Sequence, residues 1–342
     1  MKSQSFLTLI LWGLSTLAII GVITFGFYLE RDIEITGPDQ AKSPLFATPR
    51  AKSNAIGSLT GERCDNGQRR PIAVTIAGDP ITRPLTGISM ADLVVEMPVT
   101  PNGVTRMMAL FQCETPDEIG SVRSSRYDFL NLAAGWNAIY AHWGGEKESL
   151  DELETGILDN INALIYEGTV FFRKAGSVSP HNGFTSLQSL ITHAQQQKYS
   201  LVNSFKGYAR LDEIPRKNIA TLINVVDVPY PKPFDVRWTY DQTQNIYRRS
   251  RNGRPELDQL AKREVTASVI IIMKTKAEPF RDEYVQIKTE GEGAATIYQN
   301  GMSISSTWKK DAANPDSSLQ FFDSKNKEVK LTPGKIWIEI IT

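Results

Sequence analysis

The chain has 342 residues, and 38 Lys and Arg residues balance 38 Asp and Glu residues, so the formal net charge is zero. This balance argues against a dedicated nucleic-acid-binding protein, which usually carries a basic excess. Hydrophobic residues make up 41% and charged residues 22%, which are values of a globular chain rather than a disordered or multi-spanning one. Two Cys and three His residues exclude a disulfide-dense scaffold and leave little material for a zinc module.

The chain opens with an almost uninterrupted apolar run over residues 6–28. A helix needs about 20 apolar residues to cross the hydrocarbon core, and this run is long enough. Lys2 precedes the run, which predicts a cytoplasmic N-terminus and an exported body. We therefore predict an uncleaved signal anchor in residues 1–31 and a single-pass cell-membrane protein with an extracytoplasmic body. A long cleaved signal peptide is the alternative, and it would also export the body.

The chain has only two cysteines, Cys64 and Cys113, and the predicted export would place both outside the cytoplasm. Disulfides form and persist outside the cytoplasm, so these two residues are candidates for a bridge. Two free thiols are the alternative, because sequence alone does not show that two cysteines lie close together.

Composition divides the rest of the chain into four parts. Residues 32–69 are polar and rich in Pro, Ser, Gly and Lys, as expected of a flexible tether. Residues 70–208 mix apolar strand-like runs with helical spacing and predict an α/β or α+β layered domain. A connector follows at 209–235, and it contains the Pro-rich stretch PYPKPFD. Residues 236–342 predict a small all-β domain.

Short apolar runs separated by turn residues support these assignments. Asn252-Gly253 and Asn300-Gly301 are strong signals for β-hairpin turns. The expected strands are 71–77, 91–97, 105–113, 138–142, 236–240, 246–251, 268–274, 284–289, 294–299, 318–322 and 336–341. The expected helices are 126–132, 146–158 and 187–197.

Several of these segments resemble the YerB-like putative lipoprotein family, bacterial envelope proteins of unknown function. The resemblance rests on RPIAVTIAGDPITRPLTGISMADLVVEMPV, VTRMMALFQ, EIGSVRSSR, NAIYAHWGG and SPHNGFTS, and later on YRRSRNGRP, STWKKD and LTPGKIWIEII. It covers roughly residues 70–342. Two features depart from the family pattern: the lipobox Cys is absent, and Ala77-Gly78 stands where the family has Asp-Asn, with an Asp only at position 79.

Arginines gather in the family segments of the first domain. Arg presents a rigid fork of donors that suits phosphate or carboxylate, and Ser124 adds a hydroxyl between two of the arginines. The start of a helix after Arg126 would add backbone N–H groups. The candidate ligand-binding residues are Arg106, Arg123, Ser124, Arg126, His142, Arg173, His181 and Asn182. Structural ion pairs are the alternative for each Arg, and a hydrogen bond to a loop carbonyl is the alternative for each His.

The order of features is also similar, more distantly, to the LytR-CpsA-Psr family of membrane-anchored phosphotransferases. That resemblance implies that Asp79 and Asp92 help to hold a divalent metal such as Mg²⁺, and that the arginines hold a pyrophosphate of a lipid-linked glycopolymer. Met90 stands where that family has an Arg, which is a departure.

Three functions therefore stay open. The first is an envelope protein that binds an anionic cell-wall glycopolymer, or another envelope protein, through an Arg/Ser/His cleft. The second is a metal-dependent phosphotransferase, and the third is a non-catalytic structural adaptor. Whether the protein is an enzyme is left open, and no nucleic-acid partner is expected.

Overall fold

The computed structural model describes residues 55–213, 222–281 and 283–342, which all belong to one unit of the chain, 52–342. The predicted signal anchor and most of the tether lie outside these ranges. Within them, no helix combines the length and the apolar character needed to cross a membrane.

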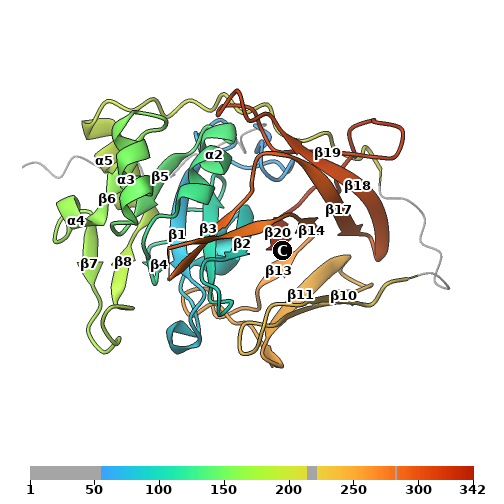
Figure 1. The fold of residues 1–342 in the computed structure, drawn as a ribbon, viewed down its shortest axis with the longest axis horizontal. Coiled ribbons are helices and arrows are strands. Elements are labelled where there is room, and N and C mark those ends of the chain that lie inside the picture. The colour runs from blue at the N-terminus through green and yellow to red at the C-terminus, as the bar shows by residue number, and fades with distance from the viewer. Residues whose placement is uncertain (1–54, 214–221, 282) are drawn as a thin grey trace, which may run out of the picture. The chain divides into compact units, whose positions relative to one another are not determined.

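A ten-stranded mixed sheet forms the centre of this unit (Figure 1). Its strands are β1 (Ile72–Ala77), β2 (Leu93–Pro98), β3 (Thr105–Phe111), β5 (Ile139–His142), β6 (Asn160–Asn162), β14 (Val269–Lys274), β17 (Gly291–Gln299), β18 (Met302–Lys310), β19 (Gln320–Phe322) and β20 (Ile336–Ile341). Their order in space is β19-β18-β17-β14-β20-β2-β3-β1-β5-β6. Strands β1 and β3 are buried along their whole length, which explains why most of their residues are apolar.

The last strand of the chain joins the two halves of the sheet. Strand β20 runs parallel to β2, with Leu93 opposite Ile336, and parallel to β14, with Val269 opposite the same residue. The segments 70–208 and 236–342 therefore contribute strands to one hydrogen-bonded sheet. The boundary between these two segments therefore divides the sequence, but both segments belong to the same sheet.

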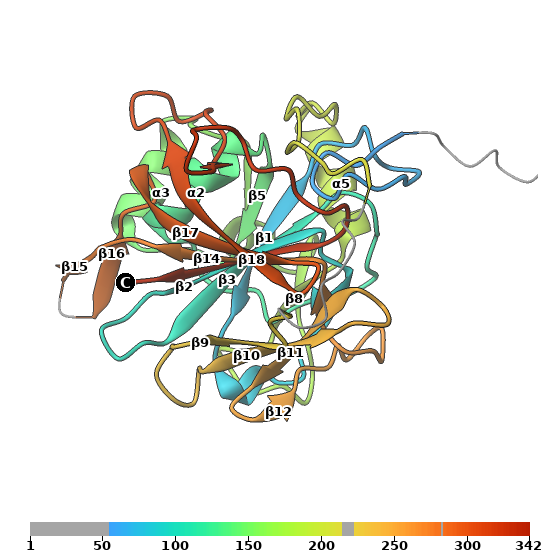
Figure 2. The same ribbon diagram turned by 90° about the vertical axis from the view of Figure 1, so that its right-hand side faces the viewer.

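A second sheet packs on one face of the first (Figure 2). It contains β9 (Val225–Val228), β10 (Val236–Asp241), β11 (Ile246–Arg251), β12 (Arg254–Pro255) and β13 (Thr266–Ala267). Buried and exposed residues alternate along β10, so Trp238 faces inward and lies in the same apolar cluster as Ile76 and Val94 of the large sheet.

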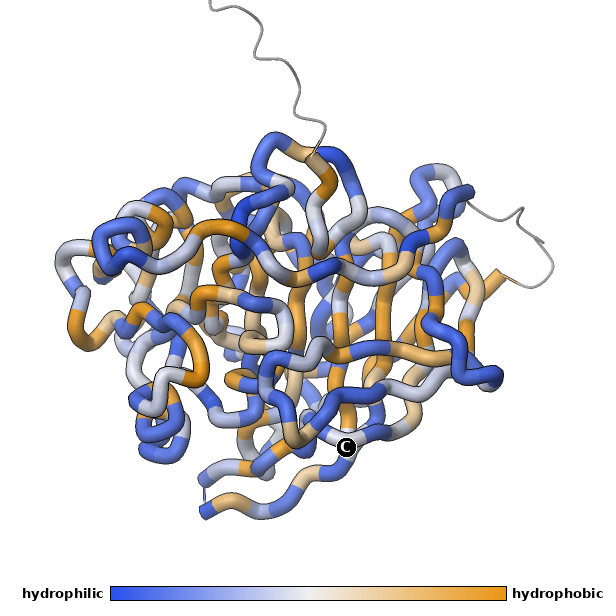
Figure 3. The backbone as a smooth tube through the Cα atoms, turned by 90° about the horizontal axis from the view of Figure 1, so that it is seen from above, coloured by the Kyte–Doolittle hydropathy of each residue, from blue (hydrophilic) through white to orange (hydrophobic). Residues whose placement is uncertain are grey.

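Helices and two small sheets complete the unit. The helices are α2 (Tyr127–Gly135), α3 (Lys147–Glu154), α4 (Ala163–Tyr166) and α5 (Leu187–Gln196), with short 3₁₀ turns at η1 (Pro80–Thr82) and η2 (Ile88–Met90). Helix α2 packs Phe129 and Leu132 into a second apolar cluster, together with Ala73 and Ile338. The small sheets are β4 (Ile119–Gly120), β8 (Gly183–Thr185) and β7 (Phe171–Arg173), and the hairpin β15 (Ala277–Phe280) and β16 (Tyr284–Ile287). Apolar segments lie mostly inside and polar segments outside (Figure 3).

The structure confirms most of the expected elements and corrects the fold class in part. Every predicted strand and helix has a counterpart, and both Asn-Gly pairs have the positive φ angles of hairpin turns. The protein is nevertheless mostly β, with few helices. Strand β18 is missing from the expectation because its sequence, MSISSTWKK, offers few apolar residues.

Candidate anion-binding site

Asp79, Arg106 and Arg123 meet at one end of the large sheet. Ala77, the last residue of β1, pairs with Arg106 at the start of β3, and Ile76 forms a bridge with Val122. Gly78 lets the chain pass close to β3, because a Cβ atom there would lie 2.2 Å from the carbonyl oxygen of Thr105. The strand register therefore places the three side chains together.

Arg106 is a buried cation at this end of the sheet, with 4% of its surface exposed. Its Nη1 donates a hydrogen bond to the carbonyl of Ser124 at 3.0 Å, whereas its buried Nε has no acceptor among the described residues. Burial and the charges of Arg126 and Arg123 lower its pKa to about 9, although Asp79 acts in the opposite direction.

The backbone holds Arg123 firmly while its side chain reaches toward the loop before β8. The backbone N–H of Arg123 donates to the carbonyl of Thr75 at 3.0 Å, and the Thr75 hydroxyl donates to the carbonyl of Arg123. Its Nη1 donates to the carbonyl of Pro180 at 3.1 Å. Burial lowers the pKa of Arg123, Asp79 opposes this, and Arg126 adds to it.

Arg126 is the third arginine, and its positive charge is better compensated than those of Arg106 and Arg123. Its Nε lies 3.6 Å from a carboxylate oxygen of Glu146, and its guanidinium lies 4.4 Å from the centre of the Tyr284 ring. Glu146 also accepts a hydrogen bond from the backbone N–H of Tyr127 at 2.7 Å. The expected use of the α2 N-terminus for a ligand is therefore wrong in part, since a carboxylate already occupies this N–H.

Asp79 and His181 approach each other across the site. Asp79 Oδ2 lies 3.9 Å from His181 Nδ1, and both atoms are buried without a hydrogen-bond partner among the described residues. Burial lowers the pKa of His181, Asp79 opposes this, and Arg123 and Arg106 add to it. Burial and the two arginines therefore disfavour the protonated imidazole, whereas Asp79 favours it.

Arg173 and Asn182 lie beside the site but contact each other. Arg173 is exposed, stacks over the Trp143 ring at 3.8 Å, and pairs with Glu167 at 2.9 Å. Its Nη1 donates to Asn182 Oδ1 at 3.1 Å. The charge of Arg173 nevertheless contributes to the lowered pKa of Arg123. We regard this pair as the rim of the cluster.

His142 has the structural role that was the alternative for it. The side chain is fully buried, its Nδ1 lies 2.8 Å from the carbonyl oxygen of Gly144, and its Nε2 lies 3.3 Å from Asn160 Oδ1. Burial lowers its pKa. Both ring nitrogens already have partners, so the expectation that His142 binds a ligand is not supported by this geometry.

Asp92 lies at the opposite end of the sheet from Asp79, which corrects the expected metal pair. Asp92 precedes β2 and its Oδ2 accepts hydrogen bonds from the backbone N–H groups of Gln112 and Cys113 at 2.6 and 2.9 Å. These residues follow the end of β3, whereas Asp79 lies near its beginning. In the described ranges, no three His, Cys, Asp or Glu side chains are grouped to hold a metal.

Cys64 and Cys113 are bonded in the structure, with Cα atoms 5.6 Å apart. The bridge lies close to Asp92 in the chain, because the carboxylate of Asp92 binds the N–H of Cys113. It ties the segment before β1 to the end of β3.

Two further groups lie beside the arginines, and sequence reasoning missed the second of them. Ser121 Oγ is buried without a partner in the described part of the chain. Tyr284 belongs to the β15–β16 hairpin and reaches Arg126 from a distant part of the sequence. The segment around Ser121 already carried a family motif, whereas nothing in the sequence connects Tyr284 with Arg126.

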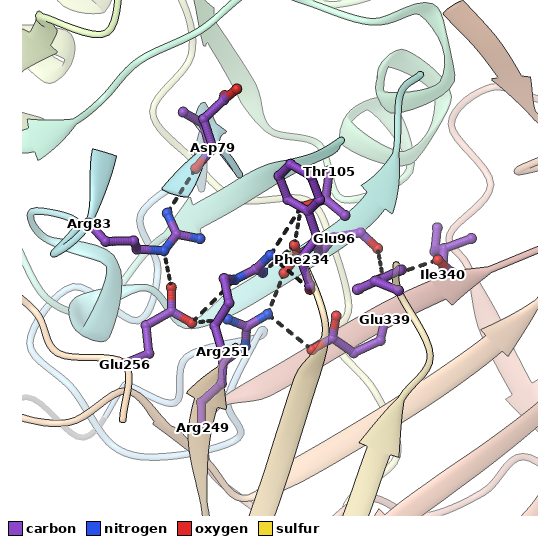
Figure 4. A network of polar contacts seen from close by, with 12 residues as sticks. Asp79, Arg83, Glu96, Thr105, Phe234, Arg249, Arg251, Glu256, Glu339 and Ile340 are labelled. Carbon is purple, nitrogen blue, oxygen red and sulfur yellow. Dashed lines mark hydrogen bonds and ion pairs between the residues drawn. The ribbon is translucent and has the colours of Figure 1, made fainter. Parts of the chain in front are cut away.

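A buried ionic network lies between the two sheets, near the arginine cluster (Figure 4). Arg249 contacts Glu96, Glu256 and Glu339, and Arg251 pairs with Glu96. Burial alone would raise the pKa of Glu96, but the charges of the two arginines outweigh burial and hold this pKa below its ordinary value. Burial raises the pKa of Glu339. All of these side chains are at most 5% exposed, so the network fixes how the sheets pack.

Comparisons with known proteins agree with this architecture. Family models described as "Protein of unknown function (DUF3048)", N-terminal and C-terminal domains, match residues 59–200 and 226–338. The chain is 28% identical over 307 residues to "Putative lipoprotein YerB" of Bacillus subtilis (strain 168), covering 86% of this chain and 88% of that protein. The crystal structure of YerB from Bacillus subtilis is similar with a TM-score of 0.75 and 29% identity, over 84% of this chain and 96% of that one. The chain belongs to the YerB-like putative lipoprotein family.

Proposed function

We propose that this protein is a membrane-anchored, extracytoplasmic protein of the cell envelope that binds an anionic ligand through Arg106, Arg123 and Arg126. The exported location is supported by the apolar run at 6–28 and by the description of the relative as a putative lipoprotein. Protease treatment of intact cells tests the location. Protection of the body from the protease would contradict it.

The uncompensated charge of the arginine cluster carries the binding proposal. Among the described residues, neither Arg106 nor Arg123 has a carboxylate oxygen within 4.0 Å. Burying a guanidinium without a paired anion costs free energy, and like charges nearby increase that cost. A phosphate or carboxylate between the two side chains would offset it by charge-assisted hydrogen bonds. Burial without a paired anion also lowers the pKa of both arginines.

The phosphotransferase alternative loses its expected metal pair, since Asp79 and Asp92 lie at opposite ends of β3. Asp79 and His181 remain as polar groups beside the arginines. No separate observation favours a reaction over binding. We therefore propose anion binding, with an anionic cell-wall glycopolymer as the ligand and without an assigned bound metal.

Replacing Arg123 tests the proposal. Arg123→Ala should lower the affinity for a phosphate-bearing glycolipid at least about tenfold, because it removes a charge-assisted pair. Arg123→Lys should recover little, since an ammonium group does not reproduce the bidentate fork. Arg237→Ala is the matched control, because Arg237 is an exposed arginine of β10 that pairs with a surface carboxylate, Asp227.

The unfolding temperature separates binding from structure. We expect Arg123→Ala to unfold near the wild-type temperature, because its guanidinium makes no ion pair with a described residue. A stability loss of several kcal/mol, as for a broken buried pair, would show that Arg123 is structural and would contradict the proposal.

A further inference from the structure

A separate cavity of about 420 Å³ lies where the turn after β1 meets the β11–β12 hairpin. Its volume falls within the range of small-molecule sites, roughly 300–1,000 Å³. Four prolines, Pro80, Pro84, Pro233 and Pro255, contribute to its wall. They come from both halves of the chain, so the cavity exists only once the two halves are assembled.

Three arginines and one carboxylate also line this cavity. The arginines are Arg83, Arg251 and Arg254, and the carboxylate is Glu256. Glu256 already has several partners: Arg83 Nε at 2.8 Å, Arg251 Nε at 4.0 Å, and Arg249. The lining therefore has an excess of positive charge.

Arg83 keeps a hydrogen-bond donor without an acceptor. Its Nη1 donates to the carbonyl of Ala77 and to Thr82 Oγ1, each at 3.2 Å. Its Nη2 is buried and has no partner among the described residues. Such a donor costs free energy unless a ligand satisfies it. Burial lowers the pKa of Arg83, and the nearby charge of Arg251 adds to this.

We propose that this cavity binds a small organic anion whose phosphate or carboxylate pairs with Arg83 and Arg254, while its ring or hydrocarbon body packs against the prolines. Arg254 is exposed on the edge strand β12 and completes a two-arginine clamp at the mouth. The site goes beyond the proposed function, because none of its lining residues belongs to the cluster of Arg106, Arg123 and Arg126.

Calorimetric titration of the detergent-solubilised full chain tests this site with phenyl phosphate, benzoate and inorganic phosphate. We expect saturable binding of phenyl phosphate or benzoate, and the tighter of the two identifies the anionic group. Inorganic phosphate should bind more weakly, since it lacks a body to pack against the prolines. Equal binding of inorganic and phenyl phosphate would overturn the assignment of an organic anion.

Two variants locate the bound probe. Arg254→Ala should weaken binding of the tighter probe about tenfold, the equivalent of one charge-assisted pair, while Arg237→Ala in strand β10 of the same sheet should not. Arg83→Met should weaken it further. If Arg83→Met fails to fold because Glu256 loses a partner, Arg254→Ala decides the question alone.

The result is independent of the arginine cluster at the end of β1. Binding of the tighter probe should survive Arg123→Ala, whereas glycolipid binding should be lost in that variant. Three outcomes would overturn this site: loss of probe binding in Arg123→Ala, equal probe binding by Arg254→Ala and Arg237→Ala, or no saturable binding of either ring-bearing probe. None of these outcomes decides the proposed function, which has its own test.

Discussion

At the scale of single residues, this protein places charged groups in two kinds of buried environment. Arg249 and Arg251 lie among carboxylates that match their charge, so their burial is compensated. Arg106 and Arg123 lie in a cluster in which positive charge exceeds negative charge. The difference separates the structural role of Arg249 and Arg251 from the binding role that we propose for Arg106 and Arg123, although every one of these residues is an arginine close to a strand.

Removing one carboxylate from the network should destabilise the fold strongly. We expect Glu96→Gln to lower the free energy of unfolding by about 3–5 kcal/mol, because both Arg249 and Arg251 lose a buried partner. Asp227→Asn breaks the exposed pair with Arg237 and should cost less than about 1 kcal/mol. Urea unfolding compares the two variants. Equal losses would show that the network does not hold the sheets together.

Asp128 should make stability depend on pH. Burial and the charge of Glu146 raise its pKa to about 7, although the N–H of Ile287 and the charge of Arg126 oppose this. Because the folded pKa exceeds the unfolded value near 4, the ionised form destabilises the fold fully above about pH 7, and this cost disappears as the pH falls toward 4.

Asp128→Asn removes this cost and keeps an oxygen that can accept from Ile287. We expect the gain in unfolding free energy to be larger at pH 8 than at pH 5 by roughly 2 kcal/mol. Chemical unfolding of both proteins at the two pH values measures it. A gain that does not change with pH would mean that Asp128 does not titrate in this range.

At the scale of elements, most strands follow from their own sequence. Strands β1, β3 and β20 are mostly apolar because neighbours cover both faces. Strands β10 and β11 alternate because one face meets the large sheet. Strand β18 could not be predicted in this way, since its identity depends on pairing with β17 over nine residues.

The disulfide between Cys64 and Cys113 belongs to this scale, because it fastens the segment before β1 to the end of β3. Thiol labelling of the denatured, unreduced protein should find no free thiol. A Cys113→Ser variant should be less stable by about 4 kcal/mol in the loop-entropy description, given a separation of 49 residues. Two labelled thiols in the exported protein would contradict the bridge.

At the scale of the whole molecule, the chain closes its central sheet with its final strand. Strand β20 lies between β2 and β14, so the two halves share a sheet and a core. A chain truncated after residue 330 should not fold, because the truncation leaves β2 and β14 with unpaired edges in the middle of the protein. Near-ultraviolet circular dichroism measures this. A truncated chain with native-like packing would show that the halves fold separately.

The sequence by itself determined most strands, the main helices, the hairpin turns and the family, because these follow from local apolar patterns, turn residues and motifs. It also predicted a shared anion site for Arg106, Arg123 and Arg126, since the family segments carry them. Tertiary structure alone decided that Asp92 lies far from Asp79, that His142 is structural, and that Tyr284 reaches Arg126. These outcomes depend on strand register and on contacts between distant segments, which a local pattern does not encode.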